Sequence, residues 1–220
     1  MEKFSPTDRT KVKRIPKRGF YDKGTIYSIL DEAIICHVGF TINDRPFIIP
    51  TSYVRSGDCL YIHGAKSNQM MDAINNGSEA CITVTLLDGY VMARSVFHHS
   101  MNYRSVVMFG KGKIVEDEEE KINALKAFTE RVMPGRWNDV RQPSEKELDS
   151  TIVLKFSIEE ASAKIRTGQA VDDEDDYKLN VWAGVLPVKT TFGRAQNDEQ
   201  LEKNIPVPGY ILNFISSKNN

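Results

Sequence analysis

Apolar residues follow two periodicities along the chain, and together they predict an antiparallel β structure with a few helices. Spacings of three or four residues predict helices at 21–33, 66–76 and 117–132, because residues so spaced share one helix face. Apolar and β-branched runs predict strands at 34–41, 47–54, 59–63, 80–87, 90–97, 103–115, 151–158, 163–166 and 182–188. Short turn sequences join several of these runs, including Asp88-Gly89. Such short connections imply antiparallel pairing, since parallel strands need long crossovers.

The order of elements predicts an α+β fold dominated by β, with a six-stranded antiparallel barrel and peripheral helices. Ser144 and Glu147 have the spacing of a capping box, which predicts another short helix. The chain contains neither GxGxxG nor GxxxxGK[ST], so a doubly wound nucleotide-binding fold is not predicted. We predict a basic arm at 1–18, one barrel domain at 19–190 and a C-terminal extension at 191–220.

The overall charge excludes a protein whose whole surface is basic. Among 220 residues, 29 Lys and Arg balance 30 Asp and Glu, which gives a net charge of -1. This balance disfavours nucleic acid or an anionic membrane as the partner of the whole surface. Residues 1–18 are locally basic, and we predict that they lie extended on the domain; nucleic-acid binding by this arm is an alternative. Residues 172–176 are all acidic and are predicted to form a solvated loop, with the basic arm as a candidate partner.

Cysteine usage and hydropathy predict a cytoplasmic protein without a membrane span. The chain has three cysteines, Cys36, Cys59 and Cys81. They are too few for a disulfide framework, and an odd number cannot all be paired. No apolar run approaches the ~18 residues that a membrane span requires. The basic N-terminal residues are not followed by the apolar segment of a secretory signal.

One local pattern indicates a phosphate site where a strand gives way to a helix. Gly64 follows His63 and permits a tight bend, and Lys66 and Ser67 lie where the next helix is predicted to begin. Free amides at a helix N-terminus favour a phosphate, to which Lys66 adds a cation and Ser67 a hydroxyl donor. The alternative is that Lys66 is simply solvated and Ser67 only caps the helix.

A second pattern is the unusually polar segment from Arg94 to Ser105, which lies between apolar strands. A connection needs few polar residues, so this concentration of His, Arg, Ser and Asn indicates a binding function. The histidine and cysteine spacings include no HxH, HxxxH or CxxC pattern, and no metal site is predicted. No GxSxG motif supports nucleophilic catalysis.

Four segments resemble a known family. Arg18 to Asp22, Pro46 to Tyr53, His63-Gly64-Ala65 and Arg94 to Arg104 are similar to the pyridoxamine 5'-phosphate oxidase-related, FMN-binding split β-barrel proteins. The block from Phe97 to Ser105 resembles the branch that includes the nitroimidazole-resistance proteins. The similarity extends from about residue 14 to residue 190.

The resemblance implies a homodimeric split barrel with FMN in clefts between the subunits. Cofactor contacts are then expected along the second strand, at the turn after the third, and on a later strand of the partner subunit. The residues concerned are Pro50, Thr51, Ser52, Tyr53, His63, Lys66, Ser67, Asn102, Tyr103, Arg104, Ser105 and Trp182. Arg104 would stabilise negative charge on the reduced flavin, and His63 would be the catalytic proton donor to a small-molecule substrate.

The implied activity is an FMN-dependent oxidoreductase with an unknown small substrate. The substrate-phosphate motifs of true pyridoxamine phosphate oxidases are absent, so oxidation of pyridoxamine phosphate is not predicted. A flavin- or haem-binding protein without catalysis is the alternative, because the family includes haem-binding members. For haem, His63 or His98 would be the axial ligand.

Overall fold

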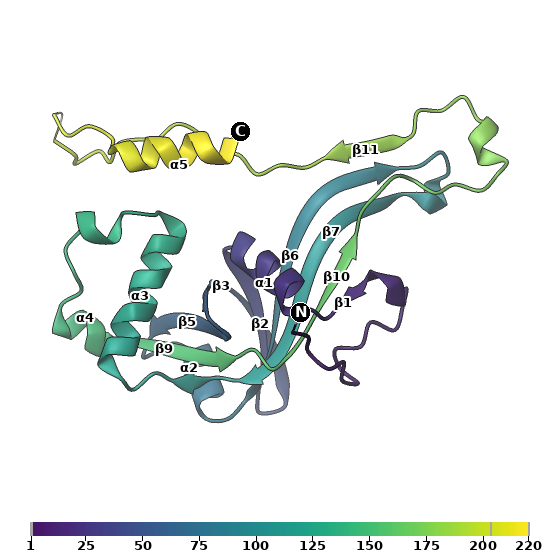
Figure 1. Ribbon diagram of the computed structural model, residues 1–220. Helices are drawn as coiled ribbons and strands as arrows, with labels where there is room; N and C mark the ends of the chain where they lie inside the picture. The colour runs from purple at the N-terminus through teal and green to yellow at the C-terminus, as the bar shows by residue number, and fades with distance from the viewer. Residues whose placement is uncertain (1, 203, 220) are drawn as a thin grey trace.

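The fold consists of two antiparallel sheets whose facing sides enclose the main core (Figure 1). The computed structural model describes residues 2–202 and 204–219. Met1 of the predicted arm, and Lys203 and Asn220 of the predicted extension, lie outside the described residues. The mainly β, antiparallel fold class with peripheral helices is therefore confirmed, with its strands divided between two sheets.

Each sheet combines strands that are far apart in the sequence. The larger sheet has seven strands, in the order β1 (Gly19–Phe20), β10 (Glu160–Arg166), β7 (Ser100–Lys111), β6 (Glu79–Met92), β2 (Ile35–Ile42) and β3 (Arg45–Ser52), with β11 (Gly184–Pro187) pairing with β6. The smaller sheet has four, in the order β4 (Val54–Ser56), β5 (Cys59–Ala65), β9 (Thr151–Ser157) and β8 (Lys113–Ile114).

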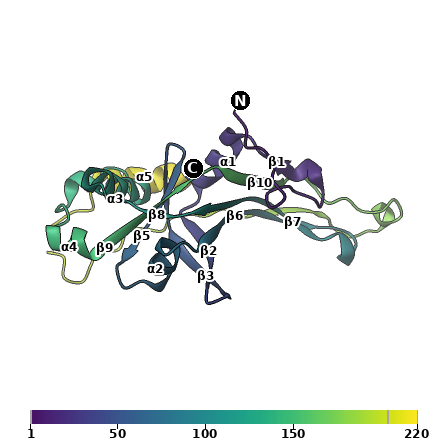
Figure 2. The same cartoon turned by 90° about the horizontal axis from the view of Figure 1, so that it is seen from below.

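The helices lie at the periphery of the sheets, as the sequence predicts. They are α1 (Lys23–Glu32), α2 (Gln69–Asn75), α3 (Glu118–Val132), α4 (Glu145–Ser150) and α5 (Gly209–Asn219). Local capping defines their starts: Asp22 caps α1, Asp117 caps α3, and Ser144 with Glu147 forms the predicted capping box of α4. Figures 1 and 2 show α3 and α4 on one side of the molecule and the long β6–β7 pair projecting on the other.

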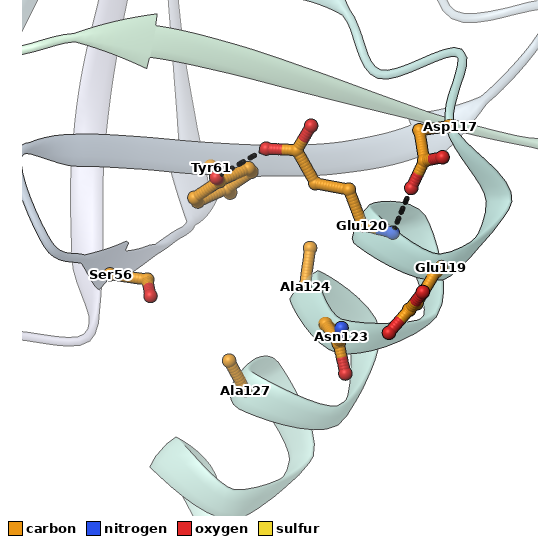
Figure 3. Close-up of a pocket in the computed structure, with 8 residues that line it drawn as sticks. All are labelled: Ser56, Tyr61, Asp117, Glu119, Glu120, Asn123, Ala124 and Ala127. Carbon is orange, nitrogen blue, oxygen red and sulfur yellow. Dashed lines mark hydrogen bonds between the residues drawn. The ribbon is translucent and has the colours of Figure 1, made fainter.

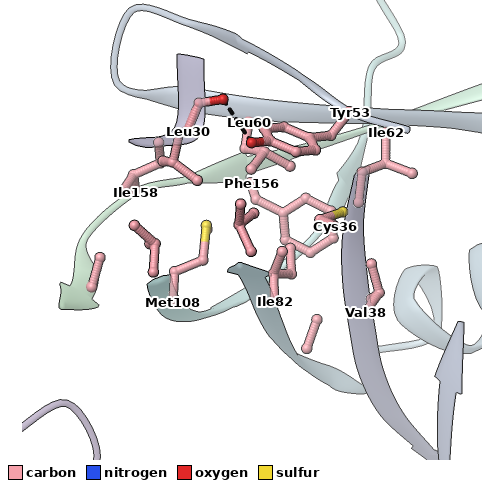
Figure 4. Close-up of a cluster of buried hydrophobic side chains, with 14 of the residues drawn as sticks. Leu30, Cys36, Val38, Tyr53, Leu60, Ile62, Ile82, Met108, Phe156 and Ile158 are labelled. Carbon is pink, nitrogen blue, oxygen red and sulfur yellow. Dashed lines mark hydrogen bonds between the residues drawn. The ribbon is translucent and has the colours of Figure 1, made fainter. Parts of the chain in front are cut away.

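The main core is built from alternate positions of the strands together with α1 and α2. Tyr53, Leu60, Ile62, Met108 and Phe156 are among its largest fully buried side chains (Figure 4). The Tyr53 hydroxyl donates a hydrogen bond of 2.6 Å to the Leu30 carbonyl at the end of α1. Among the described residues, no helix has both the length and the apolar character needed to cross a membrane.

The predicted hairpin turn at Asp88-Gly89 is wrong, because β6 continues through it as a single strand. The register shifts between Leu87 and Gly89, which marks a β-bulge. Strand β11 pairs with β6 at this point, and a Cβ on Gly89 would lie 3.0 Å from the Leu186 carbonyl oxygen. Glycine at this position therefore permits close approach of another strand.

The N-terminal arm lies against the larger sheet. Phe4 is buried in the main core, and Thr10 is also buried. Arg9 forms ion pairs with Glu79 on β6 and Glu160 on β10.

The acidic segment 172–176 lies away from the arm, near the projecting end of β6. Asp172 is buried and accepts hydrogen bonds from Arg94. Its predicted character as a solvated loop is therefore wrong at Asp172.

Candidate functional site

The most distinctive cavity in the described structure lies between the smaller sheet and the helices after β8. It measures about 500 Å³, and its wall is mainly apolar. Residues that line it include His63, Phe128, Val132, Trp137, Val140 and Leu148. Strand alternation points Ile62 into the main core, which leaves its neighbour His63 on the other face of β5, toward α3. The cavity therefore offers a mainly apolar space beside an imidazole.

The imidazole of His63 is held by packing rather than by hydrogen bonds. Its ring meets the Phe128 ring edge-on, with the centroids 4.3 Å apart and the planes at 72°. Its Nδ1 atom is buried and has no hydrogen-bond partner. Burial lowers the pKa of His63 below its ordinary value, because the charged form loses solvation. A neutral imidazole with an uncommitted nitrogen is a good metal ligand and a poor proton donor.

The lowered pKa makes the stability of the ligand-free protein depend on pH. Since the folded state disfavours protonation of His63, its stabilisation is complete above the ordinary pKa of 6.5 and is lost as pH falls through the lower, folded value. We expect the free energy of unfolding to fall between about pH 7 and pH 5, and His63→Phe to reduce that fall. Denaturant titrations at each pH measure it. The exposed His37→Phe is the matched control, and an equal change in both variants would contradict this role for burial.

The predicted phosphate residues lie in an exposed turn. Lys66 and Ser67 are both solvent-exposed, and the Lys66 amide donates a hydrogen bond of 3.1 Å to the Ser150 carbonyl. The helix begins later than predicted, at Gln69, and its cap is Asn68, whose side chain accepts from the Met70 amide. The alternative role of Ser67 as the cap is therefore wrong. Lys66 and Ser67 stay available to a ligand.

The residues predicted to contact the cofactor along the second strand, 50–53, lie in three different places: the His63 cavity, the surface and the main core. Ser52 lines the cavity with His63, so these two predicted residues come together. Pro50 is exposed on β3, and Thr51 is half-buried. The side chain of Tyr53 is committed to the main core, so only its backbone remains for a cofactor.

The four predicted residues of β7 are largely engaged within this chain. Asn102 is buried and donates to the Gly168 carbonyl, and Ser105 donates to the Lys164 carbonyl. Arg104 forms ion pairs with Glu32 and Asp88, which raise the pKa of its guanidinium. Tyr103 is half-buried and lies on the same face of β7 as Ser105. These residues do not line the His63 cavity.

Trp182 lies away from the cavity, in the segment that leads into β11. It is 68% exposed, although its ring approaches the Cα of Gly184 closely enough that a Cβ there would lie 3.0 Å away. Figure 1 shows β11 alongside the projecting end of β6, distant from α3 and α4. Within one chain, the predicted site residues thus fall into separate groups.

A smaller cavity lies between β5 and α3. It measures about 260 Å³ and is lined by Tyr61, Asp117, Glu119 and Glu120, among others (Figure 3). Glu120 accepts a hydrogen bond of 2.7 Å from the Tyr61 hydroxyl and pairs with Lys155 at 2.6 Å. These contacts lower the pKa of Glu120, Lys155 having the larger effect. Glu120 on α3 is paired with Lys155 on β9, and no sequence spacing links them.

One group of potential metal ligands lies at the projecting end of the larger sheet. The ligand atoms of His98, Asp173 and Asp176 lie within 4.8 Å of one another, and Nε2 of His98 is 3.4 Å from Oδ2 of Asp173. The sequence predicts no metal site because His98 and the aspartates are far apart along the chain. Asp173 is highly exposed, and this group is far from the His63 cavity.

Comparisons with known proteins match most of the chain. A family model described as pyridoxamine 5'-phosphate oxidase matches residues 22–165. The solved structure of flavocytochrome Anf3 from Azotobacter vinelandii is 38% identical, with a TM-score of 0.90 over 96% of this chain and 98% of that one. An FAD- and haem-binding protein from Mycobacterium smegmatis is 30% identical, with a TM-score of 0.86 over 90% of this chain and 97% of that one.

A more distant structural match extends to another branch. A candidate 5-nitroimidazole antibiotic resistance protein from Bacteroides thetaiotaomicron is 26% identical, with a TM-score of 0.57 over 67% of this chain and 86% of that one. No curated protein sequence matches significantly. The first two structures resemble this chain over nearly its whole length, including the segments outside residues 22–165.

Proposed function

The chain belongs to the pyridoxamine 5'-phosphate oxidase family, and from that membership we propose that it is a flavin-binding oxidoreductase that also binds haem. The observation that carries the haem half of this proposal is the His63 cavity. An apolar cavity of about 500 Å³ is lined by the imidazole of His63, and among the described residues the buried Nδ1 atom of that ring has no hydrogen-bond partner. Structures of a flavocytochrome and of an FAD- and haem-binding protein, at 38% and 30% identity, support the pairing of cofactors.

The residues of the cavity fit a haem. His63 would ligate the iron, and the lowered pKa of its imidazole keeps the ligating nitrogen unprotonated at neutral pH. Phe128, Val132 and Trp137 would cover the apolar ring and exclude water. Bound haem supplies one-electron chemistry and bound flavin supplies hydride or electron transfer, while the protein supplies binding and orientation. His63 is proposed as an iron ligand rather than as the catalytic proton donor that the sequence suggests.

The flavin is proposed to contact the exposed turn after β5 and the backbone of β3. Lys66 and Ser67 provide a cation and a hydroxyl for a phosphate, and both are free of the main core. FMN is the cofactor that the sequence resemblance implies. The Mycobacterium smegmatis protein binds FAD by its description, so identification of the flavin belongs to the test.

We extend the proposal to a homodimer in which the second copy completes the flavin site. Apolar side chains on the projecting part of the larger sheet support this, because Phe97 is 88% exposed and Trp182 is 68% exposed. Covering them by a second copy would remove apolar surface from water.

An absorbance spectrum of the purified protein, with the released cofactors identified by mass, tests the proposal. We expect flavin bands together with a Soret band, and loss of the Soret band with retention of flavin in His63→Ala. His37→Ala, which removes an exposed histidine, is the matched control and should retain both. A protein without flavin would refute the first half, and a Soret band that survives in His63→Ala would refute His63 as the ligand. Consumption of NADH or NADPH with a nitro compound or a quinone would distinguish an enzyme from a storage protein.

A further inference from the structure

A groove on the outer face of the larger sheet is lined by basic side chains, most of which have no acidic partner among the described residues. It measures about 220 Å³ and lies between the N-terminal arm and strands β7 and β10. The sheet contributes the floor, because Ser105 is paired with Lys164 and Val107 with Ser162, and alternate residues share a face. The arm contributes the wall, with residues from Arg9 to Arg14.

The lining of the groove contains five basic residues and no Asp or Glu. Arg9 is neutralised by its ion pairs with Glu79 and Glu160. Among the described residues, the remaining four form no salt bridge; they are Lys11, Lys13, Arg14 and Lys164. Like charges held together repel one another, so this arrangement favours an anion in the groove.

Arg166 provides an independent indication of the same chemistry. It is the next residue on this face of β10 after Lys164, and it is only 8% exposed. Its Nη atoms donate to neutral acceptors only, the Asn102 side chain and the carbonyls of Gly168 and Gln169, and its Nε is buried without a partner. A buried charge without a counter-charge is costly, and here burial and the charge of Arg18 lower the pKa of the guanidinium.

The arm is fixed in place, so its cations are positioned before any ligand arrives. The Val12 amide donates a hydrogen bond of 2.8 Å to the Tyr21 hydroxyl. The Thr7 and Thr10 side chains bond to each other, and Thr7 also bonds to Glu160 on β10. A positioned site loses less entropy on binding than a mobile arm would.

From these contacts we infer that the groove binds a ligand with two or more phosphate groups. Its cations outnumber the one to two negative charges of a single phosphate group. Ser162 adds a hydroxyl group at the floor, whereas the Ser105 hydroxyl donates to the Lys164 carbonyl. Nucleic acid fits less well, because no aromatic side chain lines the groove to stack on bases. The groove does not line the His63 cavity, but its floor includes Ser105, one of the residues expected to contact the flavin. Where the ligand is FAD, the inference therefore rests on the proposed flavin binding.

Titration of the purified full-length protein with inorganic pyrophosphate, followed by calorimetry, tests the inference. We expect pyrophosphate to bind more tightly than orthophosphate, and Lys13→Gln/Arg14→Gln to weaken binding by about tenfold or more, because two charge-assisted contacts are lost. Both residues are exposed, so the variant should fold, which circular dichroism checks. Lys126→Gln/Lys146→Gln removes two exposed lysines on α3 and α4, away from the groove, and is the matched control.

Two further measurements identify the molecule that carries the phosphates. Competition by NADPH against pyrophosphate would indicate an exchangeable pyridine dinucleotide. If a resident FAD fills the groove instead, Lys13→Gln/Arg14→Gln should contain less FAD per chain than the control. No pyrophosphate binding together with unchanged FAD content, or equal affinities in the two double variants, would overturn the inference. So would binding of a DNA oligonucleotide that pyrophosphate does not compete away. The flavin and Soret bands test the proposed function separately, because neither depends on the pyrophosphate affinity.

Discussion

Replacing Phe156 by alanine is expected to lower the free energy of unfolding by about 3–5 kcal/mol, the range for removing a fully buried aromatic side chain. Phe156 lies on β9 with no exposed surface, among the largest side chains of the main core (Figure 4). Its ring lies directly against Gly112, where a Cβ would be 2.7 Å from Cζ of Phe156. The surrounding backbone belongs to both sheets, so it cannot collapse easily into the space left by the ring.

Chemical denaturation followed by circular dichroism measures this effect. Ile48→Ala is the control, because Ile48 is 70% exposed and removal of its side chain leaves no cavity. Its effect should stay within about 0.5 kcal/mol. A loss of less than about 1 kcal/mol in Phe156→Ala would show that the core can repack around the vacated space.

Replacing Asp172 by alanine is expected to release the segment that returns from β10 to β11. The Asp172 carboxylate accepts hydrogen bonds from the Arg94 amide at 2.9 Å, the Ser95 amide at 3.3 Å and the Arg94 guanidinium at 3.1 Å. Its side chain has no exposed surface. Removing it leaves two backbone donors and a charged group without their acceptor, so amide exchange over 168–188 should accelerate on the order of tenfold or more.

Hydrogen exchange followed by mass spectrometry localises the change, and Asp173→Ala is the control because the Asp173 side chain is 84% exposed. The effect should also depend on pH. Burial raises the pKa of Asp172, but the hydrogen bonds from Arg94 and Ser95 outweigh it, so the folded pKa lies below the ordinary 3.8. The stabilisation is complete above that ordinary value and is lost as pH falls through the folded pKa. Exchange over 168–188 that is unchanged in Asp172→Ala would mean that β11 pairing alone holds the segment.

Some signals confined to a few neighbouring residues predict the fold correctly. The helix that begins after Asp117 and the capping box at Ser144 depend on contacts within one helical turn, and the structure contains both. The Asp88-Gly89 turn was wrong because the same dipeptide suits a bulge, and the choice depends on β11, which lies about a hundred residues later. The sequence around Gly89 carries no information about that strand.

The candidate site was predicted in part for the same reason. His63 was identified by its resemblance to family sequences, whereas the wall of its cavity comes from α3 and the segment before α4, which no local pattern connects to β5. The resemblance places Tyr53 at the cofactor, but its side chain lies in the main core, at the position between β3 and β4. Arg166 was missed altogether, because only the tertiary structure shows that it lacks an acidic partner.

The pairing of β5 with β9 and of β1 with β10 has a consequence for how the chain folds. Cys59 is paired with Ser157, and Gly19 with Lys164. Neither sheet can therefore be completed until its strands from the last third of the chain have left the ribosome. Contacts between such distant residues close large loops and slow the search for the native pairing. During synthesis, β2 and β3 can form a hairpin early, while the strand edges that await β9 and β10 remain open to incorrect partners. A nascent chain of this protein therefore depends on protection from aggregation until β10 is made.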